Sequence, residues 1–253
     1  MAEWKNLVIK DVTKRFDSGP CILSGIDIRI SRGSFVCVLG PSGSGKSTLA
    51  DLIAGFVKPS TGDILLDHEK VTGPGPDRVV IFQDFSNALF PWLTVAENVE
   101  FGLKKIIGDK AARRRKVLDT LGMVKLSDHI DKFPSELSGG MKQRTQIARG
   151  IVMNPDILLM DEPFGALDAI TRRHLQDELV KIWEELGQTI IFITHDIGEA
   201  LLISNRVLVL SSGPNAEIVE DFKQEHRFED PSDKGFSAAY RRIENSIESS
   251  LKT

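Results

Sequence analysis

Short runs of apolar residues alternate with segments of helical period along most of the chain. Five runs are apolar at nearly every position, and they span residues 35–39, 79–82, 157–160, 190–193 and 207–210. Strands without a polar face are typical of a mostly parallel sheet that helices cover on both sides. The pattern therefore predicts an α/β fold in which these five runs are central strands.

A smaller antiparallel layer is predicted near the N-terminus. Its evidence is two apolar runs at residues 7–12 and 22–30, together with a turn-linked pair around residues 64–71. Short apolar runs separated by turn residues favour antiparallel pairing.

Strand-like patterns are missing between residues 90 and 149. Thr94 and Glu97 have the spacing of a capping box, which marks the start of a helix. From there apolar residues recur at helical spacing, at Val95, Val99, Leu103 and Ile106 or Ile107. The sequence therefore predicts a helical lobe inserted into the sheet topology.

Composition excludes a disordered chain and a strongly basic one. Of the 253 residues 41% are apolar, which suffices for a substantial core. The 32 basic and 36 acidic side chains give a net charge of −4, so no overall positive field would attract nucleic acid or anionic lipid. No apolar run has the length of a signal peptide or approaches the roughly 20 residues that span a bilayer. Any work at a membrane is expected from its surface.

The two cysteines, Cys21 and Cys37, do not indicate a disulfide framework. Cys37 lies inside the apolar run at residues 35–39, where we expect it to be a small buried hydrophobic residue. This usage fits a reducing cytoplasm.

A phosphate-binding loop is the first candidate for chemistry. Residues 40–47 read Gly-Pro-Ser-Gly-Ser-Gly-Lys-Ser and match the pattern G-x-x-x-x-G-K-[ST] between an apolar strand and a helix. Backbone N–H groups of such a loop converge on phosphate oxygens, Lys46 would neutralise the β- and γ-phosphates, and the Ser47 hydroxyl would bind Mg²⁺. The expected nucleotide-binding residues are Gly40, Pro41, Ser42, Gly43, Ser44, Gly45, Lys46, Ser47 and Thr48. The motif alone does not separate an ATPase from a GTPase or a kinase.

Two adjacent carboxylates, Asp161 and Glu162, follow the apolar run at residues 157–160. The carboxyl ends of parallel strands are where ligands bind in such sheets. Asp161 suits the Mg²⁺ site, acting through a water, and Glu162 suits the polarisation of a water that attacks the γ-phosphate. The alternative is a pair that only caps a helix.

Residues 137–144, Leu-Ser-Gly-Gly-Met-Lys-Gln-Arg, resemble the signature of the ATP-binding cassette (ABC) ATPases. Other elements of that family follow the expected order: Gln83 matches the Q-loop, residues 165–168 match the D-loop, and His195 matches the switch histidine. The resemblance covers almost the whole chain. It implies a P-loop NTPase core, an antiparallel β subdomain and an inserted helical subdomain.

The family resemblance also implies roles for individual residues. The catalytic residues would be Glu162, His195 and Lys46, with His195 hydrogen-bonded to the γ-phosphate. Gln83 would sense Mg²⁺ and the attacking water. In a homodimer, the signature would contact the ATP of the opposite subunit, so that Ser138, Gly139, Gly140 and Asp168 act in trans. Asp168 also has the position of a helix N-cap, and both roles are compatible.

Phe16 stands where many members of the family have a tyrosine that stacks on adenine. A phenylalanine ring can still stack, although it lacks the hydroxyl. The alternative is a simple core residue.

The family resemblance divides the chain into four expected segments. Residues 1–87 would hold the nucleotide-binding core with the antiparallel layer, residues 88–154 the helical signature subdomain, and residues 155–212 the continuation of the core. Residues 213–253 would form a C-terminal tail with a peripheral strand and a polar helix near residues 238–251.

Residues 88–94, Ala-Leu-Phe-Pro-Trp-Leu-Thr, resemble a phrase of the ATPase subunits of nitrate, sulfonate and taurine importers. In that family this region helps to receive a cytoplasmic helix of the membrane subunit. The alternative is that Phe90, Trp92 and Leu93 simply pack the helical lobe together. A basic run at residues 110–116 is interpreted as a solvated helix face, with contact to lipid headgroups or to nucleic acid as the alternatives.

The resulting hypothesis is an ATP- and Mg²⁺-dependent homodimer that energises uptake of a small anion through separate permease subunits, and indirectly serves a solute-binding protein. It would be peripheral, at the cytoplasmic face of the cell membrane. An exporter or lipid-moving complex is the alternative. A soluble mechanical ATPase is disfavoured because only 55 positions separate Gln83 from Ser138, too few for a long coiled-coil arm.

Overall fold

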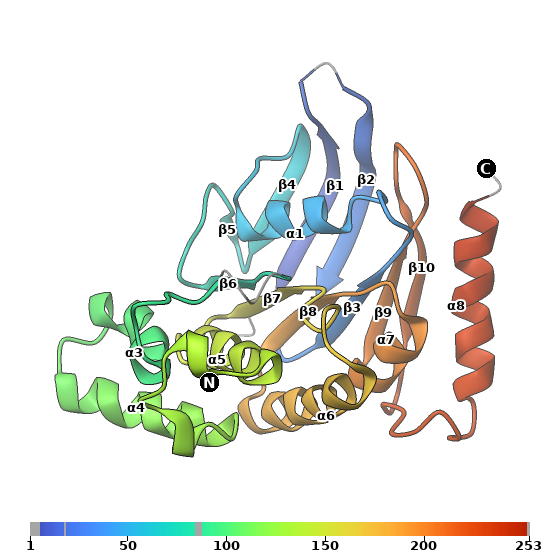
Figure 1. Cartoon of the computed structure of the whole chain (residues 1–253). Coiled ribbons are helices and arrows are strands. Elements are labelled where there is room, and N and C mark those ends of the chain that lie inside the picture. Colours follow the sequence, from blue (N-terminus) through green and yellow to red (C-terminus); the bar gives the residue numbers. More distant parts are fainter. Residues whose placement is uncertain (1–5, 18, 84–87, 252–253) are drawn as a thin grey trace.

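The computed structural model describes residues 6–17, 19–83 and 88–251. These residues contain two sheets that lie against each other (Figure 1). The antiparallel sheet has the order β2-β1-β4-β5 and is built from β1 (Leu7–Arg15), β2 (Cys21–Ile30), β4 (Thr61–Leu66) and β5 (Glu69–Lys70). The expected antiparallel layer is thereby confirmed.

The second sheet has six strands within the described ranges, in the order β10-β9-β3-β8-β7-β6. All neighbours pair in parallel except β9 and β10. Its strands are β3 (Phe35–Leu39), β6 (Arg78–Ile81), β7 (Ile157–Asp161), β8 (Thr189–Ile193), β9 (Arg206–Leu210) and β10 (Ile218–Lys223). The five apolar runs are therefore strands of one mostly parallel sheet, as predicted.

Strand β6 is not a central strand, and in this the prediction was wrong. Among the described residues it pairs only with β7 and forms the edge of the sheet, so three of its four residues are only half-buried. The strand also begins at Arg78 and ends at Ile81, which leaves Phe82 outside it and 51% exposed. An apolar run shows that a strand is covered on its faces, but not which strands are its neighbours.

Successive residues of β3 point to opposite faces of the sheet and define two cores. Phe35, Cys37 and Leu39 belong to a core with helices α6 (Ala169–Leu186) and α7 (Ile197–Ile203). Val36 and Val38 belong to a second core with α1 (Lys46–Ala54) and the antiparallel sheet. Cys37 is fully buried and carries a free thiol, as expected.

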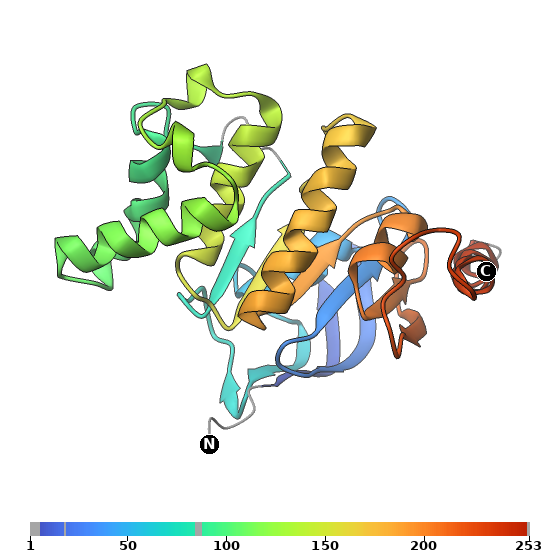
Figure 2. The ribbon, with the colours of Figure 1, turned by 90° about the horizontal axis from the view of Figure 1, so that it is seen from below.

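Residues 95–151 are largely helical and lie at one end of the molecule (Figure 2). The capping box is confirmed: Glu97 N donates to Thr94 Oγ1 at 3.3 Å, and Thr94 N donates to Glu97 Oε2 at 2.8 Å. The described elements are α3 (Val95–Glu100), the 3₁₀ helix η1 (Phe101–Lys105), α4 (Lys110–Met123), the 3₁₀ helices η2 (Ser127–His129) and η3 (Pro134–Glu136), and α5 (Gly139–Ile151). Helix α3 is shorter than the apolar spacing from Val95 onward suggests, because the chain forms the 3₁₀ helix η1 after Glu100.

The C-terminal helix α8 (Phe236–Ser250) lies at the opposite end of the molecule from α4 (Figures 1 and 2). It packs against α7, β9 and β10. Phe236, Ala239 and Ile243 are buried at spacings of three and four residues, so the helix is amphipathic and joins the core through one apolar stripe. None of the described helices combines the length and the apolar character that crossing a bilayer requires.

Candidate nucleotide-binding site

The loop at residues 40–45 joins β3 to α1, and Lys46 and Ser47 of the motif are the first residues of that helix. Gly45 precedes the first residue of α1 with φ 85°, and Gly43 has φ 80°, in the left-handed region that glycine adopts without strain. A Cβ on Gly45 would also lie 2.8 Å from Cδ2 of Leu23. The loop can therefore approach a phosphate group with bare backbone N–H groups at the start of a helix.

Lys46 and Ser44 place polar atoms inside this loop. Lys46 is 8% exposed, and its Nζ donates to the carbonyl oxygens of Gly40 and Pro41, each at 2.9 Å. Burial lowers the pKa of the Lys46 amine from its ordinary value, and the carboxylates of Glu162 and Asp161 oppose this shift. Ser44 Oγ is fully buried and has no hydrogen-bond partner among the described residues. A ligand with oxygen acceptors fits these donors.

Asp161 at the end of β7 meets the phosphate loop. The Ser47 hydroxyl donates to the Asp161 carboxylate, so two of the three residues predicted to hold Mg²⁺ lie together. Burial raises the pKa of Asp161, the bond from Ser47 lowers it, and the nearby Glu162 raises it further. A hydroxyl and a carboxylate are hard oxygen donors of the kind that Mg²⁺ prefers.

Glu162 and His195 face each other at the ends of neighbouring strands. His195 Nδ1 lies 3.2 Å from Glu162 Oε1. Glu162 has φ 43°, a left-handed conformation that costs a non-glycine residue roughly 1–2 kcal/mol, and its N–H donates to the carbonyl of Ile193 at 3.1 Å. Strained backbone of this kind is concentrated at functional sites, because it aims a side chain where regular structure cannot.

Gln83 lies at the same carboxyl end of the parallel strands. It follows β6 and is exposed, and a Cβ on Gly165 would lie 3.4 Å from its Nε2 and 3.8 Å from Glu162 Oε2. Gln146 of α5 fixes the preceding residue, since its Nε2 donates to the carbonyl of Phe82 at 3.1 Å. The predicted site residues from four separate stretches of sequence are therefore close together.

The signature and the loop at residues 165–168 form a second cluster. Ser138 caps α5 and accepts from Met141 N at 3.4 Å, while Asp168 caps α6 and accepts from Thr171 N at 2.9 Å. The bonds to Thr171 lower the pKa of Asp168. A Cβ on Gly140 would lie 3.0 Å from Cγ2 of Thr171, so the first turns of α5 and α6 lie side by side.

Phe16 is 44% exposed, and Lys14 Nζ lies 4.3 Å from the centre of its ring. The alternative of a core residue is therefore wrong. The ring is available at the surface for stacking.

Residues 88–94 divide between packing and exposure. The ring of Phe90 lies 4.5 Å from that of Phe101 and lines an apolar groove of about 310 Å³ between β6, η1 and α5. The buried Asn98 side chain donates to the carbonyls of Phe90, Leu93 and Thr94 and holds the segment in place. Trp92 is 70% exposed. The phrase thus both packs the helical lobe and presents an aromatic side chain to the outside.

A partly buried, hydrogen-bonded group behind His195 was not predicted from the sequence. Glu199, Thr194 and Gln176 are joined by hydrogen bonds, and Arg172 and Glu199 line a small hollow beside Glu162 and His195. Asp196 and Glu199 have the spacing of a helix start, and Glu199 N does donate to Asp196 Oδ1 at 2.9 Å. That spacing indicates a cap, but not that the Glu199 carboxylate turns inward.

A glycine-rich loop, a buried lysine and a carboxylate pair, gathered at the carboxyl ends of parallel strands, define a P-loop nucleotide hydrolase. Comparison with known proteins places it more narrowly. The ABC transporter family model matches residues 23–165. The bicarbonate transport ATP-binding protein CmpD of Synechocystis sp. is 43% identical over 219 residues, which are 85% of this chain and 77% of CmpD. The nitrate import ATP-binding protein NrtC of Synechococcus elongatus is 48% identical over 78% of this chain and 30% of NrtC.

A solved structure supports the same placement. The ATP-binding cassette MJ0796, a dimer in a post-hydrolysis state with bound ADP and Pi, superposes with a TM-score of 0.73 at 33% identity, covering 87% of this chain and 99% of that one. The chain belongs to the ABC transporter family and is one of its ATPases. Among its relatives it is similar to the ATP-binding proteins of bicarbonate and nitrate transport.

Proposed function

We propose that this chain hydrolyses ATP to drive the import of a small anion, of the nitrate, bicarbonate, sulfonate or taurine type, through separate membrane subunits. The observation that carries the hydrolytic part is the arrangement of Lys46, Asp161, Glu162 and His195 at one edge of the sheet. The anion class rests on the similarity to CmpD and NrtC and on residues 88–94.

Each residue then has a defined task. The loop at residues 40–48 binds the phosphates, and Lys46 exchanges its carbonyl partners for phosphate oxygens. Glu162 takes a proton from the attacking water, and His195, held 3.2 Å away, orients the γ-phosphate. Phe16 supports the adenine. Mg²⁺, when bound by Ser47, by Gln83 and through a water by Asp161, would neutralise charge on the phosphates.

A second copy of the chain completes the site. Ser138, Gly139, Gly140 and Asp168 would face the ATP of the opposite subunit, and the start of α5 offers backbone N–H groups to its γ-phosphate. The dimeric MJ0796 cassette supports this arrangement. Two ATP molecules would then lie between the two subunits, each bound by both.

The membrane partner is expected at the groove lined by Phe90 and Phe101. Arg149 and Gln146 line the same groove, and Arg149 Nη1 and Gln146 Oε1 are buried without hydrogen-bond partners among the described residues. Apolar walls with a few polar atoms suit a helix from another protein. The chain would therefore be peripheral, attached to permease subunits at the cytoplasmic face of the cell membrane, and would meet a solute-binding protein only indirectly. It has no proposed role with nucleic acid.

The test is to isolate the native complex from membranes through a tag on this chain, and to reconstitute it in liposomes. We expect ATP-dependent uptake of nitrate, bicarbonate, a sulfonate or taurine, and none with Lys46→Ala. Outward transport, or uptake only of cations or lipids, would contradict the importer assignment.

A further inference from the structure

Glu199 holds together two parts of the chain that the catalytic motifs do not connect. It lies in the first turn of α7, and its carboxylate accepts from Gln176 Nε2 of α6 at 2.7 Å. Its other oxygen accepts a hydrogen bond from the hydroxyl group of Thr194, the residue that follows β8. Burial raises the pKa of Glu199, and the two hydrogen bonds oppose this shift.

The bond to Thr194 fixes the backbone on both sides of His195. Thr194 Oγ1 donates to Glu199 and accepts from the N–H of Asp196 at 3.1 Å. Thr194 N donates to the carbonyl of Val38 in β3 at 3.2 Å. The His195 side chain itself is 67% exposed, and Glu162 is its one hydrogen-bond partner among the described residues. Its position therefore depends on how firmly the backbone at residues 194–196 is held.

The bond to Gln176 connects this backbone to α6, the helix capped by Asp168. Arg172, one turn before Gln176, donates to the carbonyl of Leu167 at 3.1 Å and so holds the loop in front of the helix. Glu199 thus lies between the loop that carries His195 and helix α6, which Asp168 caps.

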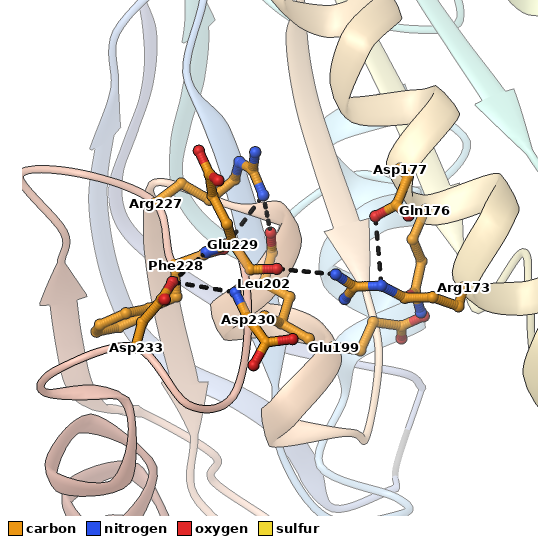
Figure 3. Close-up of polar contacts among 10 residues, drawn as sticks. All are labelled: Arg173, Gln176, Asp177, Glu199, Leu202, Arg227, Phe228, Glu229, Asp230 and Asp233. Atoms are coloured by element: carbon orange, nitrogen blue, oxygen red, sulfur yellow. Dashed lines mark hydrogen bonds and ion pairs between the residues drawn. The ribbon is translucent and has the colours of Figure 1, made fainter.

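The C-terminal segment at residues 224–235 braces the same two helices from outside (Figure 3). Arg173 of α6 donates to the carbonyl of Glu229 at 2.8 Å, and Arg227 donates to the carbonyl of Leu202 in α7 at 2.8 Å. Both helices are hydrogen-bonded to this one segment. The segment therefore helps to fix the distance between Gln176 on α6 and Glu199 on α7.

We infer that Glu199 is a positioning residue for ATP hydrolysis: by bridging Thr194 and Gln176, it keeps His195 directed at Glu162 and couples that alignment to α6. This inference rests on the proposed hydrolysis of ATP. A side chain that only filled space here could be replaced by an isosteric amide without consequence for turnover.

The geometry provides a reciprocal test. In Glu199→Gln the new side chain can accept from Thr194, but its NH₂ then faces the NH₂ of Gln176, and two donors cannot pair. Adding Gln176→Glu restores an acceptor opposite that NH₂ group. We expect kcat to fall by about ten- to a hundredfold in Glu199→Gln, as for a loosened catalytic group, and to recover most of that loss in the double variant.

The measurements are steady-state ATP hydrolysis by the purified full-length chain, the Kd for a fluorescent ATP analogue, and the melting temperature. We expect the Kd to stay within about twofold, because no residue of the phosphate loop is touched. Thr194→Val, which removes the hydroxyl and keeps the volume, should reproduce the loss of kcat. The matched control is Glu185→Gln on the exposed side of α6, which should leave all three quantities unchanged.

Unchanged kcat in Glu199→Gln and in Thr194→Val would overturn the inference. So would a loss of kcat that the double variant does not recover, or that is accompanied by an equal loss of nucleotide affinity. Failure of the proposed function is distinguishable from these outcomes, because the unsubstituted chain would then hydrolyse no ATP.

Discussion

Replacing Glu162 by glutamine tests the chemistry most directly. The change keeps the length and volume of the side chain, and the backbone stays fixed by the bond from Glu162 N to the Ile193 carbonyl. An amide can still meet His195 Nδ1 at the 3.2 Å that separates the carboxylate from it. What is lost is the ability to accept a proton from water, together with one negative charge near Lys46.

The expected loss of kcat follows from these two changes. A positioned general base contributes about 10²- to 10⁴-fold, which corresponds to about 2.7–5.4 kcal/mol of transition-state stabilisation. Nucleotide affinity should be equal or higher, because a carboxylate facing the γ-phosphate is replaced by a neutral group. ATP-bound dimers should therefore accumulate.

The assay is phosphate release under saturating ATP, with size-exclusion chromatography to detect the trapped dimer. Glu185→Gln again serves as the control for a charge removed from an exposed position. If Glu162→Gln hydrolyses ATP within about twofold of the unsubstituted chain, Glu162 is not the base.

Three further predictions concern the partner sites and the C-terminal helix. Ser138→Arg in one subunit of a mixed dimer should inactivate the nucleotide site of the other subunit, measured as half of the single-turnover phosphate burst; loss at its own site would contradict a role in trans. Trp92→Glu should abolish coupled transport but retain soluble ATPase activity, since this side chain is 70% exposed; loss of ATP binding would instead show a packing role. Ile243→Ala should lower the free energy of unfolding by about 2–4 kcal/mol in urea titrations, because the side chain is fully buried; a change below about 0.5 kcal/mol would mean that α8 is only loosely attached.

The sequence predicted those parts of the fold whose signal is local. The apolar runs that became β3, β7, β8 and β9 needed no knowledge of their neighbours, because burial on both faces leaves the same pattern in any central position. The edge position of β6 depends on strand order, which a run of valines and isoleucines does not encode. The 3₁₀ helix η1 was not predicted either. A Cβ on Gly102 in this helix would collide with Met153, and a close approach of two residues 51 positions apart leaves no local sequence pattern.

Helix α8 shows a different limit of the sequence, because its apolar stripe is a local pattern that the average composition of the segment hides. Its apolar stripe is present in the sequence at Phe236, Tyr240, Ile243 and Ile247, but arginine, glutamate and serine side chains between them give the segment a polar average. Counting composition hides a stripe that a helical period of 3.6 residues would have detected.

The candidate site divides in the same way. Lys46, Asp161 and His195 stand at the ends of predicted strands or in a contiguous motif, so topology alone predicts that they meet. Gln176 and Glu199 are 23 positions apart on different helices and meet only through the packing of α6 on α7. A partly buried glutamate at a helix start has no distinguishing sequence pattern.

The bond from Gln146 to the Phe82 carbonyl has a kinetic consequence. In the proposed dimer Gln83 contacts the ATP of its own subunit, whereas Ser138, which caps the helix that carries Gln146, contacts the other ATP. The buried side-chain amide of Gln146 therefore links the two ATP sites through a single chain. Such a linkage favours sigmoidal dependence of hydrolysis on ATP concentration, with a Hill coefficient approaching two, and Gln146→Leu should flatten that curve toward simple saturation.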